Sequence, residues 1–181
     1  EVFSTDVRKE LCPEKLSGDE WLNTMRTAHN LGMRSNTTML YGHIEKNEDR
    51  VNHLLKLREL QDETGGFMSF IPLAFHPKNT DLKDFSSTAG ILDLKMLAIG
   101  RLMLDNFDHI KAFWIMLGIK LAQISLSFGV DDIDGTVAEE KITHSAGAET
   151  PEALTVDEIK SLIEETGREP VERDTLYNQV N

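Results

Sequence analysis

Residues 67–75 read Phe-Met-Ser-Phe-Ile-Pro-Leu-Ala-Phe and are apolar at almost every position. A strand with one face in water alternates apolar and polar residues, whereas a strand covered on both faces does not. Gly65-Gly66 precedes the stretch as the end of a predicted helix, and a polar loop, His76-Pro-Lys-Asn-Thr80, follows it. The stretch therefore predicts a buried strand of the kind found in parallel sheets.

Helix and strand patterns also alternate on the N-terminal side of this strand. Residues 48–64 have the spacing of an amphipathic helix, and the Thr-rich residues 35–41 predict a short strand before it. Ser17-Gly-Asp-Glu20 is a capping-box pattern that begins an earlier helix, which Gly32 ends. The first ten residues are predicted to be a polar loop.

The alternation continues on the C-terminal side. The predicted elements are, in order, a helix over 88–104, a buried strand over 110–117, a helix over 118–128, a short strand over 130–137, a helix over 138–146, and a last helix that Thr155-Val-Asp-Glu158 caps and that runs to Gly167. Residues 173–181 are predicted to be a tail. Strand-then-helix units in succession favour parallel α/β structure.

The chain is too short for a complete α/β barrel. A (β/α)8 TIM-type barrel needs about 250 residues, and this sequence has 181. We expect one partial-barrel domain over residues 1–181, with about four parallel strands and with a C-terminal helix and tail over 150–181. Half a barrel has open sheet edges and exposes inner apolar residues such as Phe70 and Trp114. We therefore expect a homo-oligomer, or a missing N-terminal half, to cover them.

The composition narrows the class of partner. A formal net charge of −12 argues against nucleic acid and against anionic membranes, because both attract clustered Lys and Arg. The single cysteine, Cys12, excludes a disulfide framework and a thiolate cluster within this chain. No apolar run reaches the roughly 18 residues of a membrane span, and the first residues lack the plan of a signal peptide. We expect a cytoplasmic protein that acts on a small molecule.

Residues 128–141 concentrate carboxylates directly after an apolar run. A metal site is disfavoured, because the spacing differs from that of a calcium loop. Side chains alternate along a strand, so Asp132 and Asp134 share one face while Asp131 shares the other with Ile133. We predict that Asp132 and Asp134 point into the barrel and bind hydroxyl or amine groups of a ligand. The residues single out no catalytic acid or base.

The loops after strand C-termini form the ligand face of parallel α/β folds. Two of these loops carry candidates, namely Tyr41-Gly-His-Ile-Glu45 after the first strand and His76 after the second. For Tyr41–Glu45, a purely structural role is the alternative, in which Gly42 serves the turn and Glu45 interacts with the helix dipole. For His76, the alternatives to substrate binding are a base and a residue that holds the loop.

Several motifs together suggest a family. In order, they are Met39-Leu-Tyr-Gly-His-Ile-Glu45, Phe70-Ile-Pro-Leu-Ala-Phe-His-Pro77, Trp114-Ile-Met-Leu-Gly118, Asp131-Asp-Ile-Asp-Gly-Thr136 and Glu139-Glu-Lys-Ile142. In order and spacing they resemble the C-terminal half of the radical S-adenosylmethionine enzymes of the futalosine and deazaflavin branch. The resemblance is strongest to aminofutalosine synthases of menaquinone biosynthesis. Cyclic dehypoxanthinyl futalosine synthases and deazaflavin-forming synthases are similar, but they typically have Asn-Asp and Glu-Glu-Asn where this chain has Asp131-Asp132 and Glu-Glu-Lys.

The resemblance implies a fold, a reaction and site residues. The fold is the C-terminal half of a TIM-type barrel, and the intact enzyme would add a 5′-deoxyadenosyl radical to 3-[(1-carboxyvinyl)oxy]benzoate. The residues implied to contact S-adenosylmethionine are Tyr41, Gly42, Ile44 and Glu45. The cationic or hydrogen-bonding candidates for the substrate carboxylates are His43, His76 and Arg101, the last expected on an outer helix.

The resemblance also implies a four-iron four-sulfur cluster in the intact enzyme, held by three closely spaced cysteines. Cys12 alone cannot replace them, so no cluster is expected on this chain. The absence of an initiator Met favours a cut or processed product. The rival hypothesis is an α/β module that binds a nucleoside-like ligand without catalysis.

Overall fold

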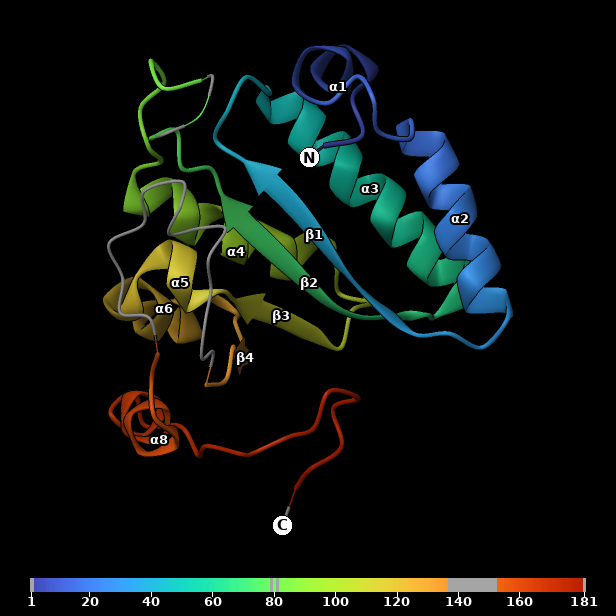
Figure 1. The fold of residues 1–181 in the computed structure, drawn as a ribbon. Coiled ribbons are helices and arrows are strands. Elements are labelled where there is room, and N and C mark those ends of the chain that lie inside the picture. The colour runs from blue at the N-terminus through green and yellow to red at the C-terminus, as the bar shows by residue number, and fades with distance from the viewer. Residues whose placement is uncertain (1, 79, 81, 137–152, 181) are drawn as a thin grey trace.

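The predicted strands form one parallel sheet. The computed structural model describes residues 2–78, 80, 82–136 and 153–180. Within them, β1 (Ser35–Tyr41), β2 (Phe67–Ala74), β3 (His109–Ala112) and β4 (Asp132–Ile133) pair in parallel, in the order β1-β2-β3-β4 (Figure 1). Parallel strands in sequential order, with a helical connection between each pair, are the arrangement of a TIM-type barrel. The α/β prediction and the half-barrel are confirmed.

Helices precede the first strand, connect successive strands and follow the last one. They are α1 (Thr5–Leu11), α2 (Gly18–Asn30), α3 (Asn47–Thr64), α4 (Gly90–Met103), α5 (Trp114–Leu117), α6 (Ile119–Ser125), the 3₁₀ turn η1 (Leu126–Phe128) and α8 (Val156–Glu164). Ser17 and Thr155 both form the predicted capping boxes, with Glu20 and Glu158 respectively. Gly65 ends α3 in the left-handed conformation, at φ 59°. The local signals in the sequence therefore placed these helix ends correctly.

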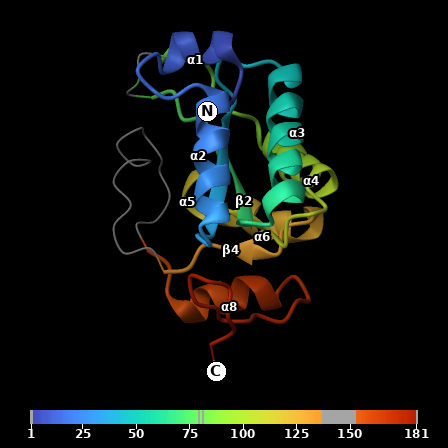
Figure 2. The ribbon, with the colours of Figure 1, turned by 90° about the vertical axis from the view of Figure 1, so that its right-hand side faces the viewer.

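The sheet has a face covered by helices and an open face. Helices α3 and α4 lie on the same side of the sheet (Figures 1 and 2). In β1 the alternate residues Thr37, Met39 and Tyr41 are buried toward the helices, while Asn36 and Thr38 are exposed on the open face. Register then places Ser69, His109 and Lys111 of β2 and β3 on the open face. In a barrel this face would be the interior.

Two apolar residues expected on the open face lie elsewhere. Phe70 is fully buried, and its ring packs closely on Gly100 of α4, since a Cβ added to Gly100 would lie only 3.1 Å from the ring. Phe70 therefore faces the helices. Trp114 is 1% exposed and begins α5. The prediction that both are uncovered was wrong, because β2 turns its large residues toward α4 and because the chain bends into a helix at Trp114.

Other boundaries also differ from the predictions. The strand predicted over 110–117 ends at Ala112, since Trp114–Leu117 is helical, and β4 covers only Asp132–Ile133. The first residues form α1 rather than a polar loop, and Val2 and Phe3 are buried. The helix predicted over 138–146 lies outside the described residues. Short apolar runs do not distinguish strand from buried helix, which explains the error at Trp114.

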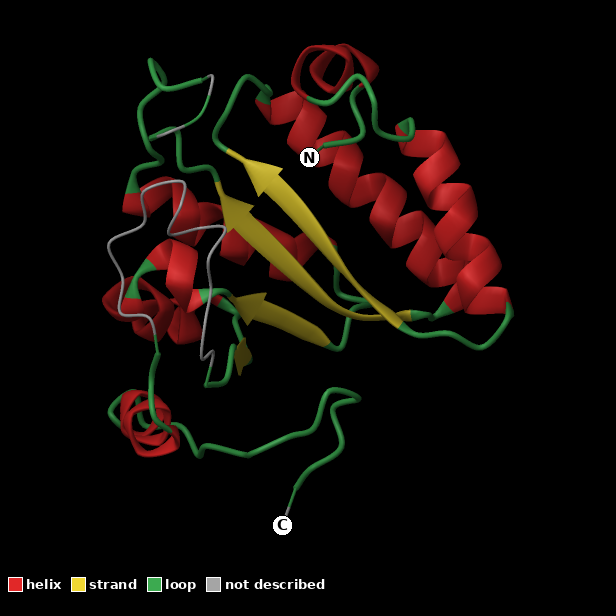
Figure 3. Ribbon diagram, in the orientation of Figure 1, coloured by secondary structure: helices red, strands yellow, loops and turns green. Residues whose placement is uncertain are grey.

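The C-terminal segment, residues 168–180, passes beneath β3 and β4 after α8 (Figures 1 and 3). It is a turn with its own hydrogen bonds, since Arg173 and Gln179 form an antiparallel bridge and Val180 N–H donates to the Glu172 carbonyl at 2.9 Å. The segment predicted to be a tail thus contains a hydrogen-bonded turn. Among the described residues, no helix offers the apolar run that a bilayer crossing requires.

Candidate functional site

Side-chain hydrogen bonds join the loops at the carboxyl ends of the strands. His76, after β2, has its Nε2 3.0 Å from the carbonyl oxygen of Met116 in α5. Trp114 Nε1 donates to the Asp134 carbonyl, after β4, at 3.2 Å. These two bonds tie the ends of β2, β3 and β4 together. His76 therefore holds a loop in this structure, and its predicted contact with a substrate stays a prediction.

The turn between β1 and α3 is held by hydrogen bonds among its own residues. Glu45 Oε1 accepts from Gly42 N–H at 2.6 Å, and Glu45 Oε2 accepts from His43 N–H at 2.8 Å. Arg50 of α3 places Nη2 2.6 Å from Glu45 Oε1. The Glu45 side chain is fully buried. Its carboxylate thus satisfies the turn and the cation at once, so the structural role considered for Glu45 is present.

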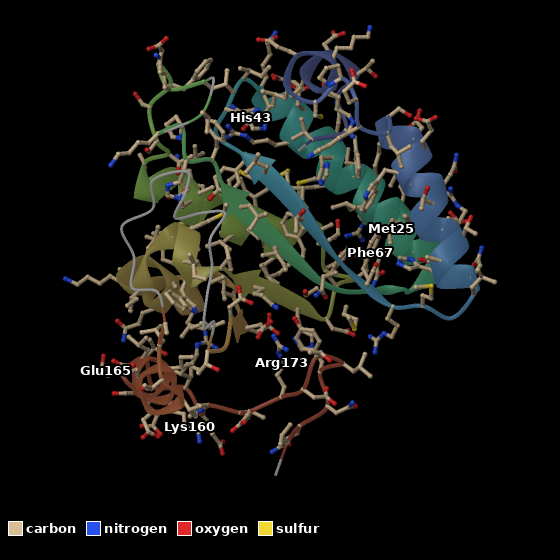
Figure 4. The ribbon with its side chains drawn as sticks, in the orientation of Figure 1. Met25, His43, Phe67, Lys160, Glu165 and Arg173 are labelled. Atoms are coloured by element: carbon tan, nitrogen blue, oxygen red, sulfur yellow. The ribbon has the colours of Figure 1, made fainter. Side chains whose placement is uncertain are left out.

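His43 completes this turn. Its Nε2 donates a hydrogen bond to the Leu40 carbonyl at 3.0 Å, and its Nδ1 accepts one from Ile44 N–H at 2.8 Å. The side chain is fully buried, near the end of β1 (Figure 4). The backbone N–H groups of Gly42, His43 and Ile44 are therefore all satisfied internally. Ile44 is half-buried and packs against the hydrophobic core, and its predicted contact with S-adenosylmethionine stays a prediction.

Tyr41 points away from the open face. It is fully buried, and its hydroxyl donates to Asp93 Oδ1 of α4 at 2.8 Å. Burial, the Asp93 charge and the hydrogen bond to Asp93 all raise the pKa of Tyr41. The tyrosine is thus a protonated residue of the helix layer. Its predicted contact with S-adenosylmethionine is untested, and this geometry confines such a contact to the Tyr41 backbone.

The buried Glu45 should affect stability in acid. Burial alone would raise the pKa of Glu45, but the hydrogen bonds to His43 and Gly42 and the charge of Arg50 outweigh it and lower the pKa to about 2. A carboxylate with a lower pKa in the folded state stabilises the protein above its unfolded pKa, and this stabilisation is lost as the pH falls toward the folded pKa. The loss between about pH 5 and pH 3 is about 2 kcal/mol for this group.

We therefore expect Glu45→Gln to flatten the pH dependence of stability. The variant is less stable at neutral pH but should lose about 2 kcal/mol less than the original protein between about pH 5 and pH 3. Urea unfolding at several pH values measures this difference. Parallel profiles for the two proteins would show that Glu45 is not the acid-sensitive group.

The open face carries a cluster of charges at β3 and β4. Lys111 Nζ lies 3.2 Å from Asp134 Oδ1 and 3.5 Å from Asp132 Oδ2, and the Lys111 side chain is 9% exposed. Lys111 and Asp132 are register partners on adjacent strands. A buried lysine requires such counter-charges. The prediction that Asp132 and Asp134 share the inner face is consistent with these contacts.

Asp131 precedes β4 and contacts groups on both faces of the sheet, so its predicted outward orientation stays a prediction. Its carboxylate forms an ion pair with Arg101 of α4 at 2.5 Å and lies 2.6 Å from Nδ1 of His109, which is on the open face. Its Oδ1 also accepts from Ile110 N–H at 2.8 Å. Arg101 is thus on an outer helix, as expected, where it also donates to the Gly129 carbonyl at 2.9 Å. Its contacts are to the protein itself.

Asp132 is bound by the C-terminal segment. Arg173 donates through Nε to Oδ1 at 3.0 Å and through Nη2 to Oδ2 at 2.8 Å, and Tyr177 OH donates to Oδ2 at 2.6 Å (Figure 4). The Asp132 side chain is 8% exposed. These donors occupy most of its acceptor sites. Sequence analysis missed Arg173 and Tyr177, since no local pattern links them to a strand about 40 residues earlier.

Asp134 has more capacity for a ligand. Its side chain is 19% exposed, and within the described residues its ion pair is with Lys111. Burial raises the pKa of Asp134, and the Lys111 charge offsets only part of this effect. Because it follows β4, it lies toward the end of the strands where ligands bind in such folds. Of the two predicted acids, Asp134 is therefore the better placed for a ligand.

The residues do not fit an iron–sulfur cluster. The sequence has one cysteine, Cys12, which is buried beside α1. Within the described ranges, no group of three or more His, Cys, Asp or Glu side chains could hold a metal ion. A four-iron cluster requires several thiolates in one place. We therefore assign no step to a cluster on this chain.

Comparisons with known proteins identify the family of the chain. Residues 64–181 match the model of the family described as the CofH/MqnC C-terminal region. An aminodeoxyfutalosine synthase of Thermus thermophilus is 53% identical, over 99% of this chain and 50% of that protein. An aminodeoxyfutalosine synthase of Streptomyces coelicolor is 43% identical, over 98% of this chain and 49% of that protein.

A second activity occurs among the relatives. The 5-amino-6-(D-ribitylamino)uracil–L-tyrosine 4-hydroxyphenyl transferase of Methanococcoides burtonii is 43% identical, over 99% of this chain and 52% of that protein. This chain thus spans about half the length of the curated relatives it matches.

Proposed function

The chain belongs to the CofH/MqnC family, whose C-terminal region it matches, and from this premise we propose that it is the C-terminal part of an aminodeoxyfutalosine synthase. The observation that carries the proposal is the 53% identity to the Thermus thermophilus synthase over nearly the whole chain. The Asp131-Asp132 and Glu-Glu-Lys motifs support the same choice. The reaction proposed for the whole protein is addition of a 5′-deoxyadenosyl radical to 3-[(1-carboxyvinyl)oxy]benzoate, with S-adenosylmethionine supplying the 5′-deoxyadenosyl group.

The part played by this chain is to bind and orient ligands. Lys111 Nζ lies 3.2 Å from Asp134 Oδ1 on the open face. This pair is toward the end of the strands where ligands bind in such folds. Lys111 can donate to a substrate carboxylate, and Asp134 can accept from a hydroxyl or amine. Ile44, at the end of β1, can pack on an apolar ring. Positioning of this kind is what a protein contributes when a cofactor supplies the reactive group.

A second candidate function is transfer to 5-amino-6-(D-ribitylamino)uracil, as in the deazaflavin-forming relatives. The 43% identity to the Methanococcoides burtonii enzyme supports it. That identity equals the value for the Streptomyces coelicolor synthase, so identity alone separates the two activities weakly. A third candidate is a module that binds a nucleoside-like ligand without catalysis.

The sheet also suggests a macromolecular partner. β1 and β4 are the edges of the described sheet, and each has one side without a paired strand in the part of the chain that the structure describes. Exposed strand edges pair readily with further strands. We propose that another copy of the chain, or a segment of the same protein outside these residues, covers them.

Product analysis of the protein that contains this chain tests the function. With S-adenosylmethionine and a reductant, we expect aminodeoxyfutalosine from 3-[(1-carboxyvinyl)oxy]benzoate, and no product from L-tyrosine with 5-amino-6-(D-ribitylamino)uracil. The reverse pattern would favour the deazaflavin branch. Tight binding of a nucleoside without turnover of either substrate pair would favour the binding module.

Lys111→Met should impair this reaction. Loss of a hydrogen bond to a charged group costs about 1.5–3 kcal/mol, so we expect kcat/KM to fall about 10- to 100-fold. The control is Lys56→Met, because Lys56 pairs with Asp19 at an exposed position on α3, away from the open face. Both variants are first compared by thermal unfolding. Unchanged kcat/KM in a folded Lys111→Met protein would remove Lys111 from the site.

A further inference from the structure

The C-terminal segment is built to present two side chains to the sheet. Asp174 accepts from the N–H groups of Leu176 and Asn178 at 2.8 and 2.9 Å, which fixes a turn. Tyr177 within this turn has φ 66° and is the one non-glycine residue with positive φ in the described part of the chain. A bulky residue in this conformation is uncommon and needs support from its surroundings. The segment therefore has a defined shape.

The presented side chains stack in layers against the sheet. The Arg173 guanidinium lies 4.0 Å from the centre of the Tyr177 ring, and the Tyr177 ring stacks on His109 of β3 at 4.0 Å with an interplanar angle of 8°. Both side chains also bind Asp132 at the start of β4. Arg173 and Tyr177 thus connect the segment to two strands at the level where those strands begin.

One oxygen atom connects this arrangement to the ligand side of the cluster. Asp132 Oδ2 accepts from Tyr177 OH at 2.6 Å and from Arg173 Nη2 at 2.8 Å, and Lys111 Nζ lies 3.5 Å from the same atom. Because two better-placed donors occupy Oδ2, Lys111 lies closer to Asp134, at 3.2 Å. The C-terminal segment thereby favours Asp134 over Asp132 as the counter-ion of Lys111.

We propose that Arg173 and Tyr177 are positioning residues, which saturate Asp132 and so hold Lys111 against Asp134, the pair that meets the polar group of a ligand. The ligand contact rests on the proposed function, whereas the effect on Lys111 does not. Neither residue touches the ligand. Their effect passes through Asp132 to Lys111, across the register pair that joins β3 and β4.

Tyr177→Phe tests the proposal without changing any charge. The variant keeps the ring that stacks on His109 and removes the hydroxyl, which donates to Asp132 Oδ2 and also has a hydrogen bond with Ser69 of β2. Lys111 should then move toward Asp132. The charged groups that act on Asp134 are Lys111, Asp132 and Arg173. Asp134 then loses part of its counter-charge, and the midpoint of its carboxyl titration should rise by about 0.5 to 1 pH unit. Carbon-13 NMR of the ligand-free chain measures this midpoint.

Two further variants complete the experiment. Arg173→Met should raise the Asp134 midpoint by more than Tyr177→Phe, because Asp132 then draws Lys111 as its remaining cation. Arg168→Met should leave the midpoint unchanged, because Arg168, in the same segment, donates to the Leu126 carbonyl and not to the acids.

The titration also separates this inference from the proposed function. An unchanged Asp134 midpoint in folded Tyr177→Phe and Arg173→Met would overturn the inference and leave the segment a stabilising role alone. Because no ligand is present, the outcome does not depend on which reaction the protein catalyses. Unchanged turnover in Lys111→Met would instead count against the ligand contact and leave the titration result intact.

Discussion

Replacing Asp132 with alanine is expected to lower the free energy of unfolding by about 3–5 kcal/mol, the range for removing one partner of a buried ion pair. Arg173, Tyr177 and Lys111 all contact this one carboxylate. Without the Asp132 carboxylate, Lys111, whose side chain is 9% exposed, and the half-buried Arg173 each lose a counter-charge. The result should be a large loss of stability, measured by urea unfolding at neutral pH.

Asp131→Ala is the matched control for this prediction. Asp131 is the neighbouring residue and also has two partners, Arg101 and His109, but its side chain is 38% exposed. Solvent screens exposed pairs, which contribute about 0–1 kcal/mol, so Asp131→Ala should cost less than half as much as Asp132→Ala. A stable Asp132→Ala protein that fails only in turnover would favour the direct contact with substrate that the sequence suggested.

Gly42→Ala is expected to destabilise the protein by about 2–4 kcal/mol, through two effects. Gly42 has φ 90°, a conformation that residues with a Cβ rarely adopt. An added Cβ would also lie 2.2 Å from Thr88 Cγ2, in the loop before α4. The substitution should therefore disturb two of the loops at the ligand end of the sheet. Thermal and urea unfolding both measure the loss.

Two companion variants separate strain from the clash. Gly65→Ala carries the strain alone, because φ is 59° and no atom lies within 4 Å of the added Cβ, and it should cost about 1–2 kcal/mol. Thr88→Ser removes the methyl group that Gly42→Ala would strike, so the double variant should recover part of the loss. Equal losses for Gly42→Ala and Gly65→Ala would show that the loop at Thr88 yields easily.

The patterns that were read correctly are local ones. Ser17 and Thr155 form capping boxes because each satisfies backbone N–H groups within three residues. The apolar stretch at residues 67–75 became a strand, because a strand covered on both faces does not alternate apolar with polar residues. Motif order and spacing also identified the family, which the match over residues 64–181 confirms.

The features that were missed depend on contacts between residues distant in sequence. An apolar residue such as Trp114 fits a buried strand as well as a buried helix. In the helix that forms, Trp114 Nε1 donates to the Asp134 carbonyl, a contact with a residue 20 positions later that no local pattern shows. Tyr41 and Glu45 carry a plausible ligand motif, yet Asp93 and Arg50 engage them. Arg173 and Tyr177 have no periodicity at all. Their partner, Asp132, comes near only when the sheet and the C-terminal segment have formed, because ion pairs depend on distance in space and not on separation along the chain.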